Sequence, residues 1–107
     1  MKTIKVNNWS DIPDNYTGKV ILSNGDKVWF KNGKCHREDG PAFIYFDGSK
    51  YWFKNGKYHR EDGPAVISSD GTKEWWINGK RVTAAEVFEQ LSAEEKREAC
   101  FNLDEWE

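Results

Sequence analysis

The residues with the greatest chemical potential in this sequence belong to a four-residue run that occurs twice. His-Arg-Glu-Asp occupies positions 36–39 and again positions 59–62. A His and an Asp three positions apart could ligate a metal ion, and two Glu side chains brought together could carry out acid–base hydrolysis. Catalysis requires one asymmetric arrangement of groups, however, whereas a motif that recurs in each unit of an array usually solves a folding problem in each unit. We therefore expect an Arg–Glu pair and an Asp-capped loop in each copy, and no catalytic residue, metal or cofactor.

These runs lie within a longer repeat. The segments 29–51 and 52–74 align without a gap and agree at 17 of 23 positions. Weaker copies extend upstream to residue 19 and downstream to residue 82, and decayed end units are usual in repeat arrays. The sequence therefore predicts tandem units of 23 residues over positions 19–82.

Turn residues divide each unit into short strands. Asn-Gly at 32–33, 55–56 and 78–79 indicates two-residue hairpins, because a type I′ turn requires positive φ at both central residues. A second set of Asn-Gly or Asp-Gly pairs stands at 24–25, 47–48 and 70–71, with runs of aromatic and β-branched residues between the turns. The Glu-Asp-Gly-Pro segments at 38–41 and 61–64 are expected to be connections. The predicted fold is mainly β, an antiparallel β-meander of hairpin repeats.

The two ends of the chain differ from the array. Residues 1–18 contain a possible strand at 4–6 and are expected to cap one edge of the sheet. Capping-box signatures at 83–86 and 92–95 predict two short helices, over 84–91 and 93–102. Val87, Phe88 and Leu91 fall on one side of the first helix, and Ala99, Cys100 and Leu103 form a weaker stripe on the second. We expect these sides to cover part of the sheet and to complete a single domain over residues 1–107.

Adjacent rings in the strands must point to opposite faces, because successive side chains of a strand alternate. The face of Phe30 is expected to be the core and carries Val28, Phe30, Tyr51, Phe53 and Trp76. On the other face, two-residue turns would place Trp29 across from His36 and Trp52 across from His59. This face is a candidate binding surface, made of Trp29, Trp52, Trp75, His36, His59, Lys31 and Lys54.

The same ladder also has a structural interpretation. Lys side chains could lie over the Trp rings, with cation–π contacts, and simply stabilise successive hairpins. Lys interleaved with Trp could alternatively follow a nucleic-acid backbone and stack bases. Residues 1–82 carry 14 Lys or Arg against 10 Asp or Glu, and this balance of +4 is too small to favour nucleic acid.

The C-terminal segment has the opposite charge. Residues 83–107 carry 2 Lys or Arg against 8 Asp or Glu, a balance of -6. Such a run is usually a solvated helix face. Phe101 and Trp106 within it are a second candidate binding surface, suited to a basic groove on a partner.

Net charge, cysteine spacing and the distribution of apolar residues indicate the class of partner and the cellular compartment. The net charge of -2 argues against a dedicated polyanion binder. Cys35 and Cys100 have no ligand-type spacing, so free thiols in a reducing compartment are expected. The first residues lack an apolar signal region and no stretch is long enough to span a bilayer, which indicates a cytoplasmic protein with no membrane partner.

The repeated Trp-Phe-Lys-Asn-Gly-Lys, followed by His-Arg-Glu-Asp-Gly-Pro-Ala and Asp-Gly-x-Lys, resembles the MORN-variant repeats over about residues 18–82. These are β-hairpin arrays that occur in proteins of tailed bacteriophages. The resemblance implies a small phage protein that binds and inhibits a host protein, such as a defence component, in the host cytoplasm. Three hypotheses follow for function: a protein-interaction domain, a small nucleic-acid binder, and a hydrolase that uses the His, Glu and Asp of the repeats. We favour the first.

Overall fold

A computed structural model describes residues 2–101 of the chain, with the side chains of residues 2–97. In chain order the elements are β1 (Thr3–Val6), the 3-10 helix η1 (Trp9–Asp11), β2 (Gly18–Leu22), β3 (Lys27–Lys31), β4 (Lys34–Cys35), β5 (Phe43–Ile44), β6 (Lys50–Tyr51), β7 (Phe53–Lys54), β8 (Lys57–Tyr58), β9 (Val66–Ile67), β10 (Lys73–Ile77), β11 (Lys80–Val82), α1 (Ala84–Glu89) and α2 (Ala93–Phe101). The fold is mainly β, as the sequence predicts.

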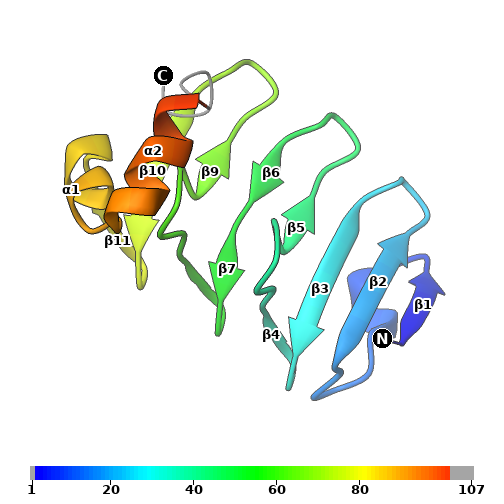
Figure 1. The fold of residues 1–107 in the computed structure, drawn as a ribbon. Helices are drawn as coiled ribbons and strands as arrows, with labels where there is room; N and C mark the ends of the chain where they lie inside the picture. The colour runs from blue at the N-terminus through cyan, green and yellow to red at the C-terminus, as the bar shows by residue number, and fades with distance from the viewer. Residues whose placement is uncertain (1, 102–107) are drawn as a thin grey trace.

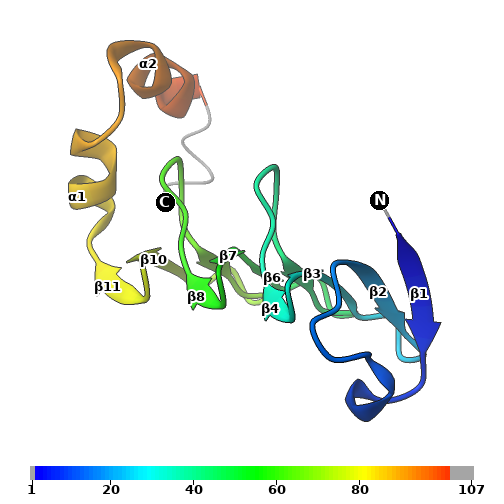
Figure 2. The same cartoon turned by 90° about the horizontal axis from the view of Figure 1, so that it is seen from below.

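The strands form one long, open sheet in the order β1-β2-β3-β5-β6-β9-β10-β11. Figure 1 shows this sheet with the chain progressing from β1 at one edge to β11 at the other. β4 pairs with β3 off this path, and β7 and β8 form a separate two-stranded sheet. Figure 2 shows a single layer, from one face of which α1, α2 and two long loops rise. Such a sheet leaves the two faces of its central strands open for much of their length.

The N-terminal strand is in place at the sheet edge, but its direction differs from a pure meander. β1 pairs with β2 in parallel, with Thr3 opposite Lys19 and Val6 opposite Leu22. Every other strand pair is antiparallel in the described residues. A parallel pair requires a crossover connection, and the segment between β1 and β2, which contains η1, provides it. The sheet is therefore mixed.

The predicted Asn-Gly hairpins are confirmed by the backbone. Asn32, Asn55 and Asn78 have φ values of 50°, 52° and 49°, and each is followed by a glycine with φ of 80° or 81°. Two successive residues with positive φ define the type I′ turn, whose twist matches that of the strands it joins.

The buried core lies toward the N-terminal end of the sheet. Tyr16, Val20, Leu22 and Val28 form it, and Ile12, which follows η1, and side chains of the neighbouring strands are half-buried around them. Val20 and Val28 lie opposite each other in β2 and β3 and are completely buried. This places the core on the Phe30 face, as the alternation of residues predicts.

Both predicted C-terminal helices are present, with ends within a few residues of those expected. Thr83 Oγ1 accepts the Glu86 N–H at 3.1 Å, and Ser92 with Glu95 forms a complete capping box. Val87 and Leu91 are buried and α1 contacts β10, so α1 covers the end of the sheet. The expected stripe on α2 and the side chains of Phe101 and Trp106 lie outside the described part. No helix in the described residues is long and apolar enough to cross a membrane.

Candidate functional site

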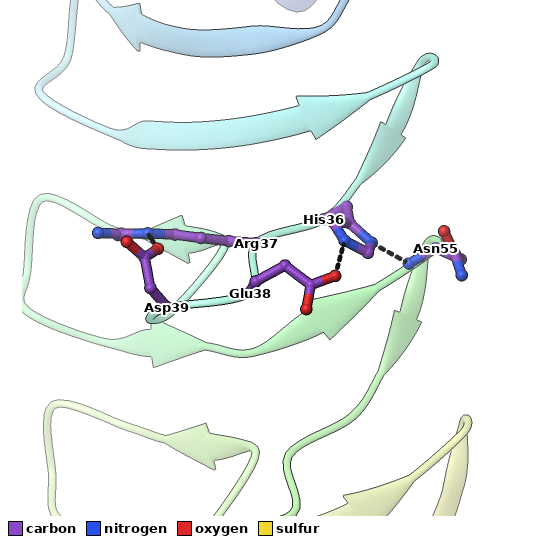
Figure 3. A network of polar contacts seen from close by, with 5 residues as sticks. All are labelled: His36, Arg37, Glu38, Asp39 and Asn55. Carbon is purple, nitrogen blue, oxygen red and sulfur yellow. Dashed lines mark hydrogen bonds and ion pairs between the residues drawn. The ribbon is translucent and has the colours of Figure 1, made fainter. Parts of the chain in front are cut away.

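His36 joins one hairpin unit to the next. Its Nδ1 accepts the backbone N–H of Asn55 at 3.0 Å, and its Nε2 lies 2.8 Å from a carboxylate oxygen of Glu38 (Figure 3). A nitrogen that accepts an N–H carries no proton, so the ring is neutral and Nε2–H donates to Glu38. The hydrogen bond from His36, with the nearby Lys54 ammonium, lowers the pKa of Glu38. Both ring nitrogens are thus occupied by structural hydrogen bonds.

Arg37 points to the other side of the same loop. Its Nε donates to Asp39 at 2.9 Å, one terminal nitrogen donates to the Pro41 carbonyl at 3.1 Å, and its guanidinium lies 4.0 Å from the ring centroid of Trp29. The Arg37 partner is therefore Asp39, and the expected Arg–Glu pair is wrong, because the neighbouring Glu38 is engaged with His36. A Cβ atom at position 40 would lie 3.0 Å from the guanidinium carbon of Arg37. The position of the Arg37 side chain over the loop therefore favours glycine at residue 40.

The second run reproduces these contacts. His59 Nδ1 accepts the Asn78 N–H at 3.0 Å and Nε2 lies 3.1 Å from Glu61. Arg60 donates to Asp62 at 2.8 Å and to the Pro64 carbonyl at 3.1 Å, and it lies 4.1 Å from the Trp52 ring centroid. A contact that recurs identically after 23 positions in the chain is typical of a structural device. In the described residues, no group of three or more His, Cys, Asp or Glu side chains is arranged to hold a metal ion.

The Trp ladder is in the predicted register but is covered. The backbone N–H of His36 donates to the backbone carbonyl of Trp29 at 3.0 Å, and the backbone N–H of His59 donates to that of Trp52 at the same distance. These bonds confirm the cross-strand pairing. Trp29 is nevertheless only 8% exposed, because Arg37 and Lys19 lie against its ring. The expectation that Trp29 is an exposed ring is wrong. The cations over Trp29 and Trp52 include an arginine from the connecting loop in each case, Arg37 and Arg60.

The other members of the predicted ladder are spread over this face. His36 is buried, whereas Trp52, His59 and Trp75 are half-buried. Lys31 and Lys54 are exposed, and both lie close enough to Glu38 to lower its pKa. The structure therefore places these side chains on one face, where the tryptophan rings are buried or half-buried.

The two loops enclose a groove of about 550 Å³. Its lining includes Trp52, Lys54, Arg60, the two acidic loops and Glu95 of α2. The groove lining carries three permanent cations, Arg37, Lys54 and Arg60, against five carboxylates, Glu38, Asp39, Glu61, Asp62 and Glu95. The groove is therefore more acidic than basic, which disfavours a nucleic-acid backbone within it.

The opposite face carries a continuous row of aromatic rings. Its successive contacts have ring centroids 4.4–6.4 Å apart and join Trp9, Phe30, Phe43, Tyr45, Tyr51, Phe53, Tyr58 and Trp76. We call these residues the aromatic face. Phe30, Phe43, Tyr51, Phe53, Tyr58 and Trp76 are half-buried, and burial raises the pKa values of Tyr51 and Tyr58. Cys35, across from Phe30, is a free thiol whose pKa burial also raises. This face is only partly a core.

Three large aromatic or apolar side chains are exposed in the described residues: Trp9 (47%), Tyr45 (38%) and Phe46 (71%). Trp9 and Tyr45 both contact Phe43 of the aromatic face. Phe46 lies at the following turn, beside Gly25 of the preceding hairpin. None of the three was among the site residues predicted from the sequence.

A signal for two of them was present in the repeat itself. Tyr45 and Phe46 align with Ser68 and Ser69 in the next unit. The backbone at these turns is closely similar, since Tyr45 N–H donates to the Ser49 carbonyl at 2.9 Å and Ser68 N–H donates to the Thr72 carbonyl at 2.8 Å. The same turn therefore forms with serine at these positions, whereas in this unit Tyr45 packs against Phe43 and Tyr51 and Phe46 is largely exposed.

Comparison with known proteins yields no relative to guide assignment: no protein-family model, no curated protein and no solved structure matches this chain.

Proposed function

We propose that this chain is a protein-binding module that contacts its partner through the aromatic face and the exposed turn next to it, with Tyr45 of that face and Phe46 of the turn as anchors. The observation that carries the proposal is the replacement of two serines by two exposed rings at one turn of an otherwise repeated pattern. Exposed aromatic side chains on a soluble domain mark interaction sites, and aromatic residues dominate binding energy at protein interfaces.

The geometry of the aromatic face also suits a protein partner. Its rings lie edge to face or tilted against one another on one side of the sheet, so they form one continuous apolar surface that a partner can cover. The half-buried Phe43 and Tyr51 lie between exposed Tyr45 and the rest of the row. This arrangement resembles an interface with a central anchor and supporting contacts.

The two other hypotheses have less support. A hydrolase needs a ring nitrogen or a carboxylate that is free to exchange a proton, whereas His36 and His59 use both ring nitrogens in hydrogen bonds. A single-strand nucleic-acid binder that used the Trp/Lys face would need uncovered rings there for base stacking, whereas Arg37 and Arg60 lie over Trp29 and Trp52. The MORN-variant resemblance and the inhibition of a host protein that it implies remain part of this proposal.

Photo-crosslinking from single positions tests the proposal. The variant Phe46→p-benzoylphenylalanine keeps an aromatic side chain at the exposed turn, and Ser69→p-benzoylphenylalanine places the same probe at the aligned turn of the next unit. Each variant is irradiated in host-cell lysate, and the adducts are identified by mass spectrometry.

The proposal predicts that the probe at position 46 crosslinks to one defined host protein. An excess of the unlabelled protein should abolish this adduct, and the probe at position 69 should not form it. An adduct of the chain with itself would instead make the aromatic face a self-association surface. Equal adducts from positions 46 and 69 would contradict a site at Tyr45 and Phe46.

A further inference from the structure

A second, chemically different row crosses the sheet on the face of Trp29. Directly paired residues follow one another from β1 to β10 in the order Lys5, Ile21, Lys27, Ile44, Lys50, Ile67 and Lys73. Side chains that lie directly opposite in neighbouring strands point to the same face. Lysine and isoleucine therefore alternate across seven strands, and we call this set the Lys/Ile row.

Three lysines of this row, Lys5, Lys27 and Lys50, are exposed and accessible to a ligand. Lys73 and the three isoleucines of the row are half-buried. In the described residues, the side chains of Lys27 and Lys50 form no ion pair, whereas the arginines on the same face are paired with aspartates. The positive charges of Lys27 and Lys50 are thus not neutralised by an ion pair within the described residues.

The alternation follows from the repeat, because each unit contributes one isoleucine (Ile21, Ile44, Ile67) and one lysine (Lys27, Lys50, Lys73) to this face. Isoleucine suits a half-buried strand position. Here every intervening position is lysine, which leaves like charges two strands apart. Because neighbouring strands are about 4.8 Å apart, the lysines recur about every 10 Å with an apolar side chain midway.

We infer that the Lys/Ile row binds an α-helix of a partner protein that carries an acidic side chain every second turn and an apolar side chain on the turn between. One helical turn rises about 5.4 Å and two turns about 10.8 Å, so acidic residues seven apart lie close to the lysine spacing. Apolar residues three or four positions after each acid lie over the isoleucines. The flexible lysine side chains absorb the difference of about 1 Å per pair.

The isoleucines distinguish this ligand from a nucleic acid. A phosphate backbone would use the lysines but would make no use of an apolar side chain between each pair. The chain itself shows that acidic helical residues are compatible with this face, because Glu95 of α2 lines the groove beside Trp52 and Lys54. The inference rests on the proposed protein-binding function and names the chemistry of a second contact surface.

The test is an NMR titration of the full-length ¹⁵N-labelled protein with a synthetic helical peptide of 22 residues. Its Ala- and Gln-based sequence carries Glu at every seventh position and Leu midway between. A control peptide has the same composition, with its leucines moved to the opposite side of the helix. We expect shifts of the amides of Lys27, Ile44 and Lys50, and a dissociation constant about tenfold lower for the matched peptide.

Two charge reversals locate the site. Lys27→Glu with Lys50→Glu should weaken matched-peptide binding by about tenfold or more, whereas Lys34→Glu with Lys80→Glu, at hairpin tips, should change it less than about twofold. Equal binding of both peptides, or tighter binding of a single-stranded oligo(dT) at the same amides, would overturn the inference. Tyr45→Ser with Phe46→Ser should leave peptide binding intact, so failure here is distinguishable from failure at the aromatic face.

Discussion

The backbone N–H of Asn55 donates to Nδ1 of His36 at 3.0 Å. This bond connects the loop of one unit to the Asn-Gly turn of the next, and Asn78 makes the same bond to His59. At the first turn the Asn32 N–H donates instead to Thr17 Oγ1 at 2.9 Å. Each hairpin turn is therefore held by a side-chain acceptor from the preceding segment.

Loss of this acceptor should destabilise the array. His36→Ala leaves the part-buried Asn55 N–H without its partner, and we expect the free energy of unfolding to fall by about 1–3 kcal/mol in urea denaturation. His59→Ala should cost less, because the Asn78 bond is exposed to water that can replace the acceptor. A larger loss at His59 than at His36 would contradict this account of the two histidines.

The stacked arginines should be sensitive to a change that retains their charge. Arg37→Lys keeps a positive charge near Asp39 but loses the planar contact with Trp29 and the bond to the Pro41 carbonyl. We expect a loss of about 1–2 kcal/mol in thermal or urea unfolding. Lys34→Arg, at an exposed hairpin position, is the matched control and should be close to neutral. An unchanged stability of Arg37→Lys would show that charge alone accounts for the contact.

Stability should fall in acid. Hydrogen bonds lower the pKa values of Asp39 (from Arg37), Asp47 (from the Ser49 N–H) and Asp70 (from the Thr72 N–H). A carboxyl group whose pKa is lowered by folding stabilises the folded state above its unfolded pKa, about 3.9, and this contribution is lost as the pH falls through the lower folded value. We expect the melting temperature to decrease below about pH 4.

Asp47→Asn isolates one of these groups. The amide oxygen can still accept the Ser49 N–H at the position of Asp47 Oδ1, which lies at 2.9 Å, but the side chain no longer titrates. The variant should therefore lose less stability than the parent protein between pH 5 and pH 2. A pH profile identical to that of the parent would show that Asp47 does not contribute to the acid dependence.

Much of the fold could be predicted from the sequence because its signals are local. The Asn-Gly pairs require positive φ, and the capping boxes at Thr83 and Ser92 fix where the helices begin. Strand alternation also separated the face of Trp29 from that of Phe30. The parallel direction of β1 could not be predicted, because it depends on the path of the connection through η1.

The candidate site was harder to predict, for a physical reason. Alternation indicates which residues share a face but not what lies on top of them, and the loop arginines bury Trp29 from above. The exposed rings at Tyr45 and Phe46 were visible in the sequence only as departures from the repeat. They can be found in the sequence as exposed aromatic residues in one unit whose aligned residues in the next unit are serines.

The affinity of the protein for the crosslinked partner tests the central claim most directly. Isothermal titration calorimetry with the purified partner compares the parent protein with Tyr45→Ser combined with Phe46→Ser, which copies the chain's own next unit. We predict binding at least about 30-fold weaker, because the loss of even one anchor ring typically costs about 2 kcal/mol, with an unfolding free energy within about 1 kcal/mol of the parent. Unchanged affinity in this folded variant would contradict the claim that the chain binds through its aromatic face.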